Sequence, residues 1–271
     1  MPAYICITCG VQFAPSDAPP PNCPICDDER QYVGWRGQRW TTLDEMAAQG
    51  YRNELRDEEP GLTSIGTTPG FAIGQRALLV QTPAGNVLWD CQHYLDGDTI
   101  AAVQELGGVQ AIAISHPHFY GVNVEWAEAF DAPVYIHAAD REWIMRPSDH
   151  VTFFNEEVIE PVAGLSLIRL GGHFDGATVL HWPGGAEGDG ALLCGDTIQV
   201  VMDRRYVSFM YSYPNLIPLG PSEIEGIVER MRPYRFSRLY GAWNGRVVTA
   251  DGWNAIERSA ARYIARVREI K

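Results

Sequence analysis

The feature that most restricts the fold of this chain is a pair of histidines at the end of a short apolar run. The run VQAIAIS, residues 109–115, is typical of a buried strand, and His116 and His118 follow it directly. On an extended backbone, two side chains separated by one residue point to the same side. Open α/β sheets place their binding sites at such strand ends. The chain is therefore expected to fold around a sheet whose edge presents both imidazoles to one site.

Two more side chains that can ligate a metal stand beside other predicted strands. His173 lies in GGHFDGATVLHW, just before the strand ATVLHW, and Asp196 ends the strand-like ALLCGD. Four ligands from three regions of the chain are enough to hold one ion and to leave a position open for water. The residues therefore predict a hydrolytic metal centre made of His116, His118, His173 and Asp196.

The surrounding sequence alternates between strand and helix patterns. Residues 77–90 predict two short strands around a PAGN turn, and Asp98 is expected to cap the helix that follows it. The segment AADREWIM predicts another helix, and Ser222 with Glu225 forms a capping box for SEIEGIVERM. This alternation is typical of an α/β fold.

A different metal chemistry is encoded near the N-terminus. Cys6, Cys9, Cys23 and Cys26 form the pattern C-x2-C-x13-C-x2-C in a proline-rich segment with no long periodic apolar stretch. Such a segment cannot bury a core of its own, so another part of the chain must hold it. Four thiolates at this spacing predict a structural metal, with zinc as the expected ion. Two local disulfides or free thiols are the alternatives.

Because this segment differs in character from the rest of the sequence, we predict two domains. They are a zinc-ribbon-like module in residues 1–40 and a main domain in residues 41–271. The module also resembles a rubredoxin, whose knuckles read CxxCG and CPxCG and hold iron. Asp27 stands where that pattern has its second glycine, which weakens the iron interpretation.

Composition excludes some functions. The net charge of −13 and the pI near 4.9 disfavour a nucleic-acid surface. The sequence contains no run near the roughly 18 apolar residues of a membrane span. Four of the six cysteines fall in the CxxC pairs, which suits a reducing compartment, and Cys91 and Cys194 are expected to be buried core thiols. We therefore expect a cytoplasmic protein with a small-molecule substrate and no nucleic-acid or membrane partner; a homo-oligomer is compatible with these features.

The order of the motifs resembles the metallo-β-lactamase superfamily over roughly residues 60–250. The successive stretches are GNVLWDC, AISHPHFYG, APVYIHAADREW, GGHFDGATVL and LLCGDTI. The resemblance implies an αββα sandwich. In that family one or two metals are surrounded by five elements. These are an acidic residue at a strand end, here Asp90, an HxHxDH signature, a GH motif, a GD motif and a late histidine.

The sequence departs from that family at the ligands of the second metal. Tyr120 and Gly121 stand where the signature has Asp and His, and residues 242–244 (Ala-Trp-Asn) stand where the late histidine is expected. The histidines of the first metal position are all present, as is Asp196. The resemblance thus implies a one-metal site, with Tyr120 and Trp243 in the volume of the second metal.

Hydrolysis is the leading hypothesis for such a site. One metal, zinc or less favourably iron, would lower the pKa of a bound water toward about 7 for attack on an ester, thioester or lactone. In this scheme Asp196 binds the metal or its water, and Asp90 orients a ligand histidine. Tyr120 either donates its phenol to a developing oxyanion or simply fills the vacated metal position.

Two other functions are open. His116, His173 and Asp196 match the two-histidine, one-carboxylate set of non-haem iron oxygenases, a usage that resembles the persulfide dioxygenases of the same superfamily. A degenerate fold can also act as a non-catalytic binding module. Substrate-binding residues are not identified, although the aromatic segment 203–220 is a candidate cleft wall or lid. Alternatively, its aromatics pack on the ribbon or on a partner chain, while Arg204 and Arg205 offer contacts to an anion.

Overall fold

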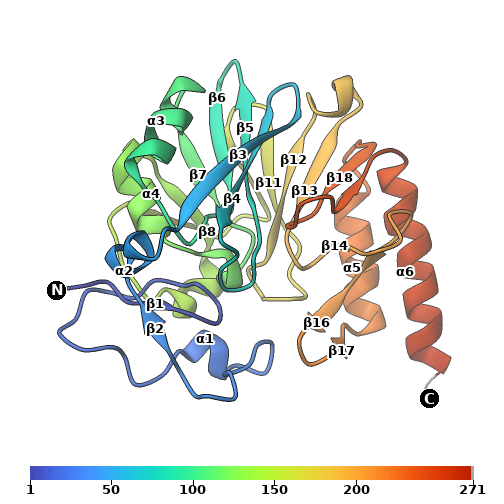
Figure 1. Ribbon diagram of the computed structural model, residues 1–271. Coiled ribbons are helices and arrows are strands. Elements are labelled where there is room, and N and C mark those ends of the chain that lie inside the picture. The colour runs from blue at the N-terminus through green and yellow to red at the C-terminus, as the bar shows by residue number, and fades with distance from the viewer. Residues whose placement is uncertain (270–271) are drawn as a thin grey trace.

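The computed structural model describes residues 1–269 and contains two β-sheets packed face to face between helices (Figure 1). The first sheet has seven strands in sequential order. They are β3 (Arg52–Glu59), β4 (Leu62–Thr68), β5 (Ala77–Thr82), β6 (Gly85–Trp89), β7 (Ala111–Ala113), β8 (Val134–His137) and β9 (Val151–Phe154).

The second sheet has six strands in the order β10-β11-β12-β13-β18-β19. They are β10 (Val158–Val162), β11 (Leu165–Arg169), β12 (Thr178–Trp182), β13 (Ala191–Cys194), β18 (Arg238–Tyr240) and β19 (Val247–Val248). Helices α3 (Gly97–Glu105) and α4 (Asn123–Phe130) lie outside the first sheet, and α5 (Pro221–Met231) and α6 (Gly252–Glu269) lie outside the second. This arrangement confirms the predicted αββα sandwich.

Three apolar layers hold the sandwich together. Between the sheets, Trp89 of β6 packs in one cluster with Leu180 of β12 and Leu193 of β13. Outside each sheet, the apolar faces of the helices form two further clusters. Strand β7 is buried on both faces, which explains why its sequence is continuously apolar rather than alternating.

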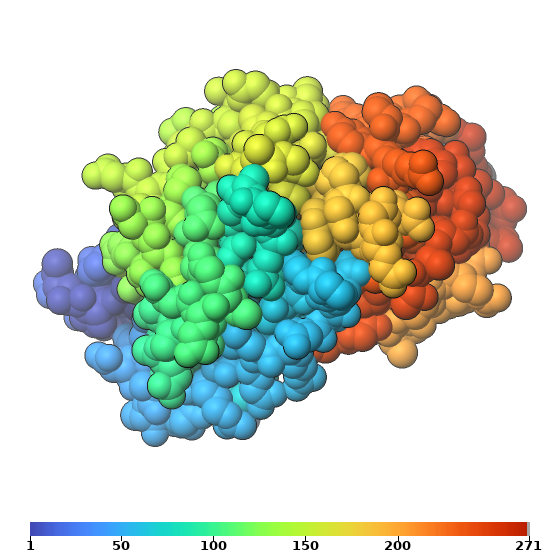
Figure 2. All heavy atoms as spheres, turned by 90° about the horizontal axis from the view of Figure 1, so that it is seen from above, coloured from blue at the N-terminus to red at the C-terminus, as the bar shows by residue number. Residues whose placement is uncertain are grey.

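The direction of the strands determines where a site can form. Strands β6, β7 and β8 run parallel to one another, and β13 runs parallel to β18. The carboxyl ends of β6, β7 and β13 therefore meet at one edge, which is the lower edge in Figure 1. From the opposite end, most of the N-terminal segment is hidden behind the rest of the molecule (Figure 2).

The N-terminal segment covers the site edge. Strand β1 (Ile5–Cys6) pairs with β2 (Trp40–Thr41). A short helix, α1 (Pro24–Asp27), lies between these strands in the sequence, and another, α2 (Leu43–Ala48), follows β2. Ile5 and the four cysteines belong to the same hydrophobic cluster as Trp126 of α4. The main fold thus holds a segment that has no core of its own. The division between residues 1–40 and 41–271 stays a prediction.

Three local predictions were wrong. Asp96, not Asp98, caps α3, because its Oδ1 accepts the Thr99 amide at 2.8 Å. Helix α5 begins at Pro221, where a proline loses no helical hydrogen bond, and its cap is Gly220 with the Glu223 carboxylate 2.9 Å from the Gly220 amide. The segment after β8 forms only a 3-10 helix, η2 (Ala138–Trp143).

Within residues 1–269, no helix combines the length and apolar character needed to cross a membrane.

Candidate metal centres

The structure brings the predicted ligands of the main domain together at the site edge. Their ligand atoms all lie within 4.8 Å of one another, and the four residues are His116, His118, His173 and Asp196. His173 Nε2 lies 3.2 Å from His118 Nδ1, and His116 Nε2 lies 3.6 Å from Asp196 Oδ2. These separations suit four donors around one ion, because metal–nitrogen and metal–oxygen bonds are about 2.0–2.2 Å long.

Local backbone structure explains how these side chains converge. His116 follows β7 in extended conformation, and His118 sits in the 3-10 turn η1 (Pro117–Phe119). Gly195, which joins β13 to Asp196, lies against Ser115; a Cβ at this position would be 2.5 Å from the Ser115 hydroxyl. Only a glycine therefore lets the ends of β7 and β13 come this close.

Neighbouring groups fix the orientation of two imidazoles. His173 Nδ1 lies 3.0 Å from the Met210 carbonyl, which requires a proton on Nδ1 and leaves the Nε2 lone pair facing the cluster. His116 Nδ1 lies 2.9 Å from the Ser115 hydroxyl. Both rings are thus held with Nε2 toward the other ligands.

Burial sets the protonation of the cluster. It lowers the pKa of His118 well below its usual value and that of His173 to about 4, which favours the neutral, metal-ligating form. Burial opposes ionisation of Asp196, but hydrogen bonding and charge from His116, followed by His173, lower the pKa of this carboxyl overall.

The unpartnered atoms fit a cation. Within residues 1–269, His116 Nε2 faces the cluster and has no hydrogen-bond partner, and neither has Asp196 Oδ1. His118 Nε2 is also unpartnered, but this ring turns its Nδ1 toward His173 and so presents Nδ1, not Nε2, to the cluster. A buried polar group without a partner costs about 1–3 kcal/mol. A metal ion held by the cluster would supply partners for donors that otherwise have none.

A cavity of about 370 Å³ opens onto this cluster. Tyr213 and Pro214 of its wall belong to the segment 203–220, the predicted candidate cleft wall, whereas Gln199 was not predicted. Tyr213 donates its hydroxyl to the Asp196 carbonyl at 3.0 Å, and Gln199 stands beside the Asp196 carboxylate. The twelve lining residues are Thr8, Gln31, Tyr32, Ala72, Ile73, His118, His173, Asp196, Gln199, Tyr213, Pro214 and Trp243.

Asp90 lies outside the ligand cluster. Its Oδ1 accepts the Ser115 amide at 2.8 Å, so it holds the backbone before His116 rather than an imidazole ring, which corrects the predicted contact. Burial raises the pKa of Asp90 to about 8. Its position supports a role in fixing the end of β7.

Tyr120 does not face the metal centre, contrary to the prediction. Its side chain is 1% exposed and its hydroxyl lies 3.4 Å from the Asp140 carbonyl, away from the residues that line the cavity. The next residue, Gly121, has φ +51°, and a Cβ there would lie 2.4 Å from the Gln92 carbonyl. The Gln12 amide donates to the Gly121 carbonyl at 3.2 Å. The backbone of Cys91 and Gln92 thus leaves no room for a ligand side chain at this position.

Trp243, by contrast, lines the cavity. Its indole nitrogen donates to the Ile73 carbonyl at 3.2 Å, and its ring lies 6.1 Å from that of Phe119. At the position where the late histidine was expected, the aromatic side chain of Trp243 therefore forms part of the cavity wall.

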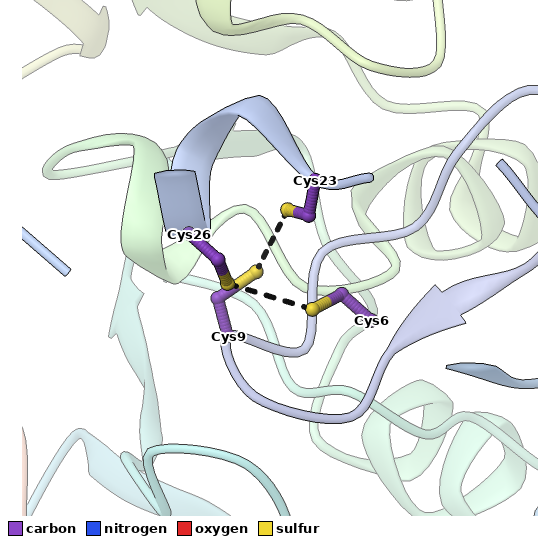
Figure 3. A group of neighbouring side chains, drawn as sticks. All are labelled: Cys6, Cys9, Cys23 and Cys26. Atoms are coloured by element: carbon purple, nitrogen blue, oxygen red, sulfur yellow. Dashed lines mark hydrogen bonds between the residues drawn. The ribbon is translucent and has the colours of Figure 1, made fainter. Parts of the chain in front are cut away.

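The four N-terminal cysteines form the second cluster (Figure 3). Cys6 Sγ lies 3.6 Å from Cys26 Sγ, and Cys9 Sγ lies 3.7 Å from Cys23 Sγ. A tetrahedron of ~2.3 Å zinc–thiolate bonds has edges of about 3.8 Å, so the spacing fits such an ion. All four are free thiols in this structure, so the disulfide alternative is not seen.

The clustered thiols affect one another's pKa values. Contacts with Cys23, Cys26 and Cys9 lower the pKa of the Cys6 thiol. Burial raises the pKa of Cys9, and the contact with Cys23 raises that of Cys26. Without an ion the cluster thus stabilises one thiolate and disfavours others, whereas a dication would stabilise all four.

Two histidines and two arginines outside the clusters have structural contacts. His93 Nδ1 lies 3.2 Å from the Gly10 carbonyl and links the first cysteine knuckle to the main fold, and His181 Nε2 lies 2.8 Å from the Arg235 carbonyl. Arg205 pairs with Asp203, and Arg204 donates to the Gly245 carbonyl. The two arginines are thus engaged by their own neighbours, which weakens the predicted anion contact.

Comparison with known proteins agrees with the fold. The family model described as metallo-beta-lactamase superfamily matches residues 72–232. The uncharacterized protein YmaE of Bacillus subtilis (strain 168) is 56% identical over 265 residues, covering 97% of this chain and 96% of that protein.

Solved structures show the same architecture at low sequence identity. The crystal structure of VMB-1 has a TM-score of 0.60 at 12% identity and covers 80% of this chain and 98% of its own. The structure of DIM-1 metallo-beta-lactamase exposed to ceftazidime has a TM-score of 0.55 at 12% identity, with 78% and 97% covered. Given the family match, the sandwich and the ligand cluster at its site edge, this chain belongs to the metallo-β-lactamase superfamily.

Proposed function

We propose that the protein is a metal-dependent hydrolase with one metal in the cleft, acting on an ester, thioester or lactone. The observation that carries this proposal is the convergence of four buried ligand atoms within 4.8 Å of one another, beside a cavity that reaches His118, His173 and Asp196. When bound, a divalent metal such as zinc lowers the pKa of a coordinated water toward about 7 and polarises a carbonyl group.

The residues of this chain have separable roles in the proposal. The three histidines and Asp196 hold the ion, and Met210 fixes His173 through its carbonyl. Tyr213 holds the backbone of Asp196. Because Tyr120 points away, Gln199 is the uncharged donor that we place beside the reacting carbonyl.

Metal content is the first test. Protein purified without chelator and supplied with zinc should hold two ions per chain, one at each cluster. His116→Ala should hold one, whereas His150→Ala, which changes a histidine outside both clusters, should hold two. An ion count of one in the unaltered protein would refute the metal centre.

Turnover is the second test. A panel of thioesters, lactones, simple esters and phosphoesters should yield a substrate whose hydrolysis is lost in His116→Ala and kept in His150→Ala. Gln199→Ala should lower kcat more than it changes KM if its amide acts on the transition state. Zinc in both clusters with no turnover on any ester would point instead to a binding module.

Metal analysis of the same protein preparation distinguishes the iron hypothesis from the zinc hypothesis. Iron rather than zinc at the histidine cluster, with oxygen uptake on a persulfide, would favour the oxygenase hypothesis over hydrolysis. A cytoplasmic location and a small-molecule substrate remain part of the proposal, as does compatibility with a homo-oligomer.

A further inference from the structure

The N-terminal cysteine segment forms one wall of the cavity that opens onto the histidine cluster. Thr8, Gln31 and Tyr32 line this cavity together with His118 and other residues of the main fold. Thr8 lies between Cys6 and Cys9, inside the first knuckle. The geometry of the cysteine cluster therefore sets the position of a residue in the cleft.

A hairpin of the main fold clamps the part of this wall that follows the second knuckle. Strands β16 (Met210–Ser212) and β17 (Ile217–Pro218) form the hairpin. The Asn215 amide donates to the carbonyls of Glu29 and Gln31, at 2.9 Å each. The Ser212 hydroxyl donates to the Arg30 carbonyl at 3.0 Å. Three hydrogen bonds from one hairpin thus hold the backbone carbonyls of the three residues before Tyr32.

Arg30 does not line the cavity, although, in addition to burial, its charge helps to lower the pKa of His118 and His173. Its guanidinium carbon lies 4.1 Å from the centre of the Phe174 ring, and its Nε lies 3.0 Å from the Asp28 carboxylate. Phe174 in turn packs 5.0 Å from the His118 ring. Arg30 therefore supports the ligand histidines from behind.

Apart from the metal ligands, every side chain that lines the cavity is uncharged. Tyr32 and Trp243 contribute aromatic surface, and Gln31 and Gln199 contribute neutral hydrogen-bonding groups. Tyr32 is 53% exposed, so one face of its ring is available at the cavity mouth. Such a wall favours an aromatic or aliphatic group and offers no cation for a carboxylate or phosphate.

Resting on the proposed function, we propose that the cysteine segment is the substrate-recognition wall of the histidine site. Tyr32 and Gln31 contact the group that flanks the scissile bond, and that group is neutral and aromatic or aliphatic. The cysteine metal and the β16–β17 hairpin hold this wall in place.

Two thiols that ligate zinc test the proposal without requiring turnover. Benzyl mercaptan carries a neutral aromatic flank, and mercaptoacetate carries a carboxylate. Calorimetric titration of protein holding two zinc ions should show benzyl mercaptan binding about tenfold more tightly than mercaptoacetate. Tyr32→Ala should weaken benzyl mercaptan about fivefold and leave mercaptoacetate nearly unchanged.

Trp35→Ala is the matched control. Trp35 is an exposed aromatic three residues along the same segment, and it does not line the cavity. Its removal should change neither affinity. Zinc content of two per chain in each variant confirms that the clusters are intact.

Each outcome separates the inference from the proposed function. Equal effects of Tyr32→Ala and Trp35→Ala, or tighter binding of mercaptoacetate, would overturn the recognition wall even if esters are hydrolysed. If Tyr32→Ala selectively weakens the binding of benzyl mercaptan but no ester is turned over, the recognition wall is supported and the hydrolase proposal is rejected. Failure of both thiols to bind protein holding two zinc ions would also overturn the wall.

Discussion

The cysteine cluster and the histidine cluster differ in donor type and in access. The cysteine cluster contains four thiols, each at most 2% exposed, and none of them lines the cavity that opens onto the histidine cluster. The histidine cluster mixes imidazole and carboxylate donors, and a cavity reaches His118, His173 and Asp196. Closed thiolate sites are typical of structural metals, whereas open nitrogen and oxygen sites are typical of catalytic ones.

The comparison also shows that the two clusters are joined. One short segment contributes Cys26 to the first cluster and Gln31 and Tyr32 to the wall of the second. A metal held by the cysteine cluster would therefore help to position part of the cavity wall beside the histidine cluster. Variants that disturb one cluster at a time test how far this division of roles holds.

The largest effect is expected from loss of the cysteine metal. Cys9→Ser should destabilise the protein by about 4 kcal/mol or more, because the segment has no core of its own and its ion contributes folding energy. The unfolding midpoint should fall by about 10 °C, as measured by circular dichroism. A midpoint equal to that of unaltered protein would show that the cluster is not structural.

A smaller loss of stability is expected when the histidine cluster loses its ion. His116→Ala should lose the cleft ion and about 3 kcal/mol of ligand-linked stability at an ion concentration near 100 times Kd. It should also lower turnover at least about 100-fold while keeping the cysteine ion. Simultaneous loss of both ions would contradict the separation of the two clusters.

Gly121→Ala tests the close packing of this glycine against the backbone of Cys91 and Gln92. The added Cβ would lie 2.4 Å from the Gln92 carbonyl at a φ of +51°, so we expect a loss of about 2 kcal/mol in denaturant unfolding. Both ions should remain. A neutral effect would mean that the position can carry a side chain and that a second metal ligand is sterically allowed there.

Acid should weaken the link between the first knuckle and the main fold. Burial lowers the pKa of His93 from 6.5 to about 4, so the unfolded chain binds the extra proton first as the pH falls. The lowered folded pKa means that stability is lost as the pH decreases below about 6.5. Unaltered protein should lose about 1 kcal/mol more between pH 7 and 5.5 than His93→Gln does. Equal losses would show that His93 stays neutral in both states.

Tyr120→Phe should have the smallest effect. Its hydroxyl makes one 3.4 Å contact with the Asp140 carbonyl, so its removal should change stability by no more than about 1 kcal/mol. Ester turnover should stay within about twofold, because the phenol does not reach the cavity. A loss of kcat near 100-fold would restore the oxyanion role that the sequence suggested.

Part of the fold was readable from local patterns. The run before His116 forms a strand that is buried on both faces, as its continuous apolar sequence predicts. Strand β3, by contrast, has the sequence RNELRDEE and no apolar alternation. It forms at the edge of the sheet, where one side is open to solvent, so its sequence lacks the signal of a buried strand.

The sequence by itself determined which residues can ligate metal, because ligand chemistry belongs to the side chain and strand ends place such residues at one edge. It therefore predicted both clusters. Only the tertiary structure decided where Tyr120 points, since its hydroxyl meets the carbonyl of Asp140 in a different part of the chain. It also decided that Tyr32 faces the cleft, because the hairpin bond from Asn215 fixes the backbone before it. Contacts between distant parts of a chain leave no periodic trace in the sequence of either part.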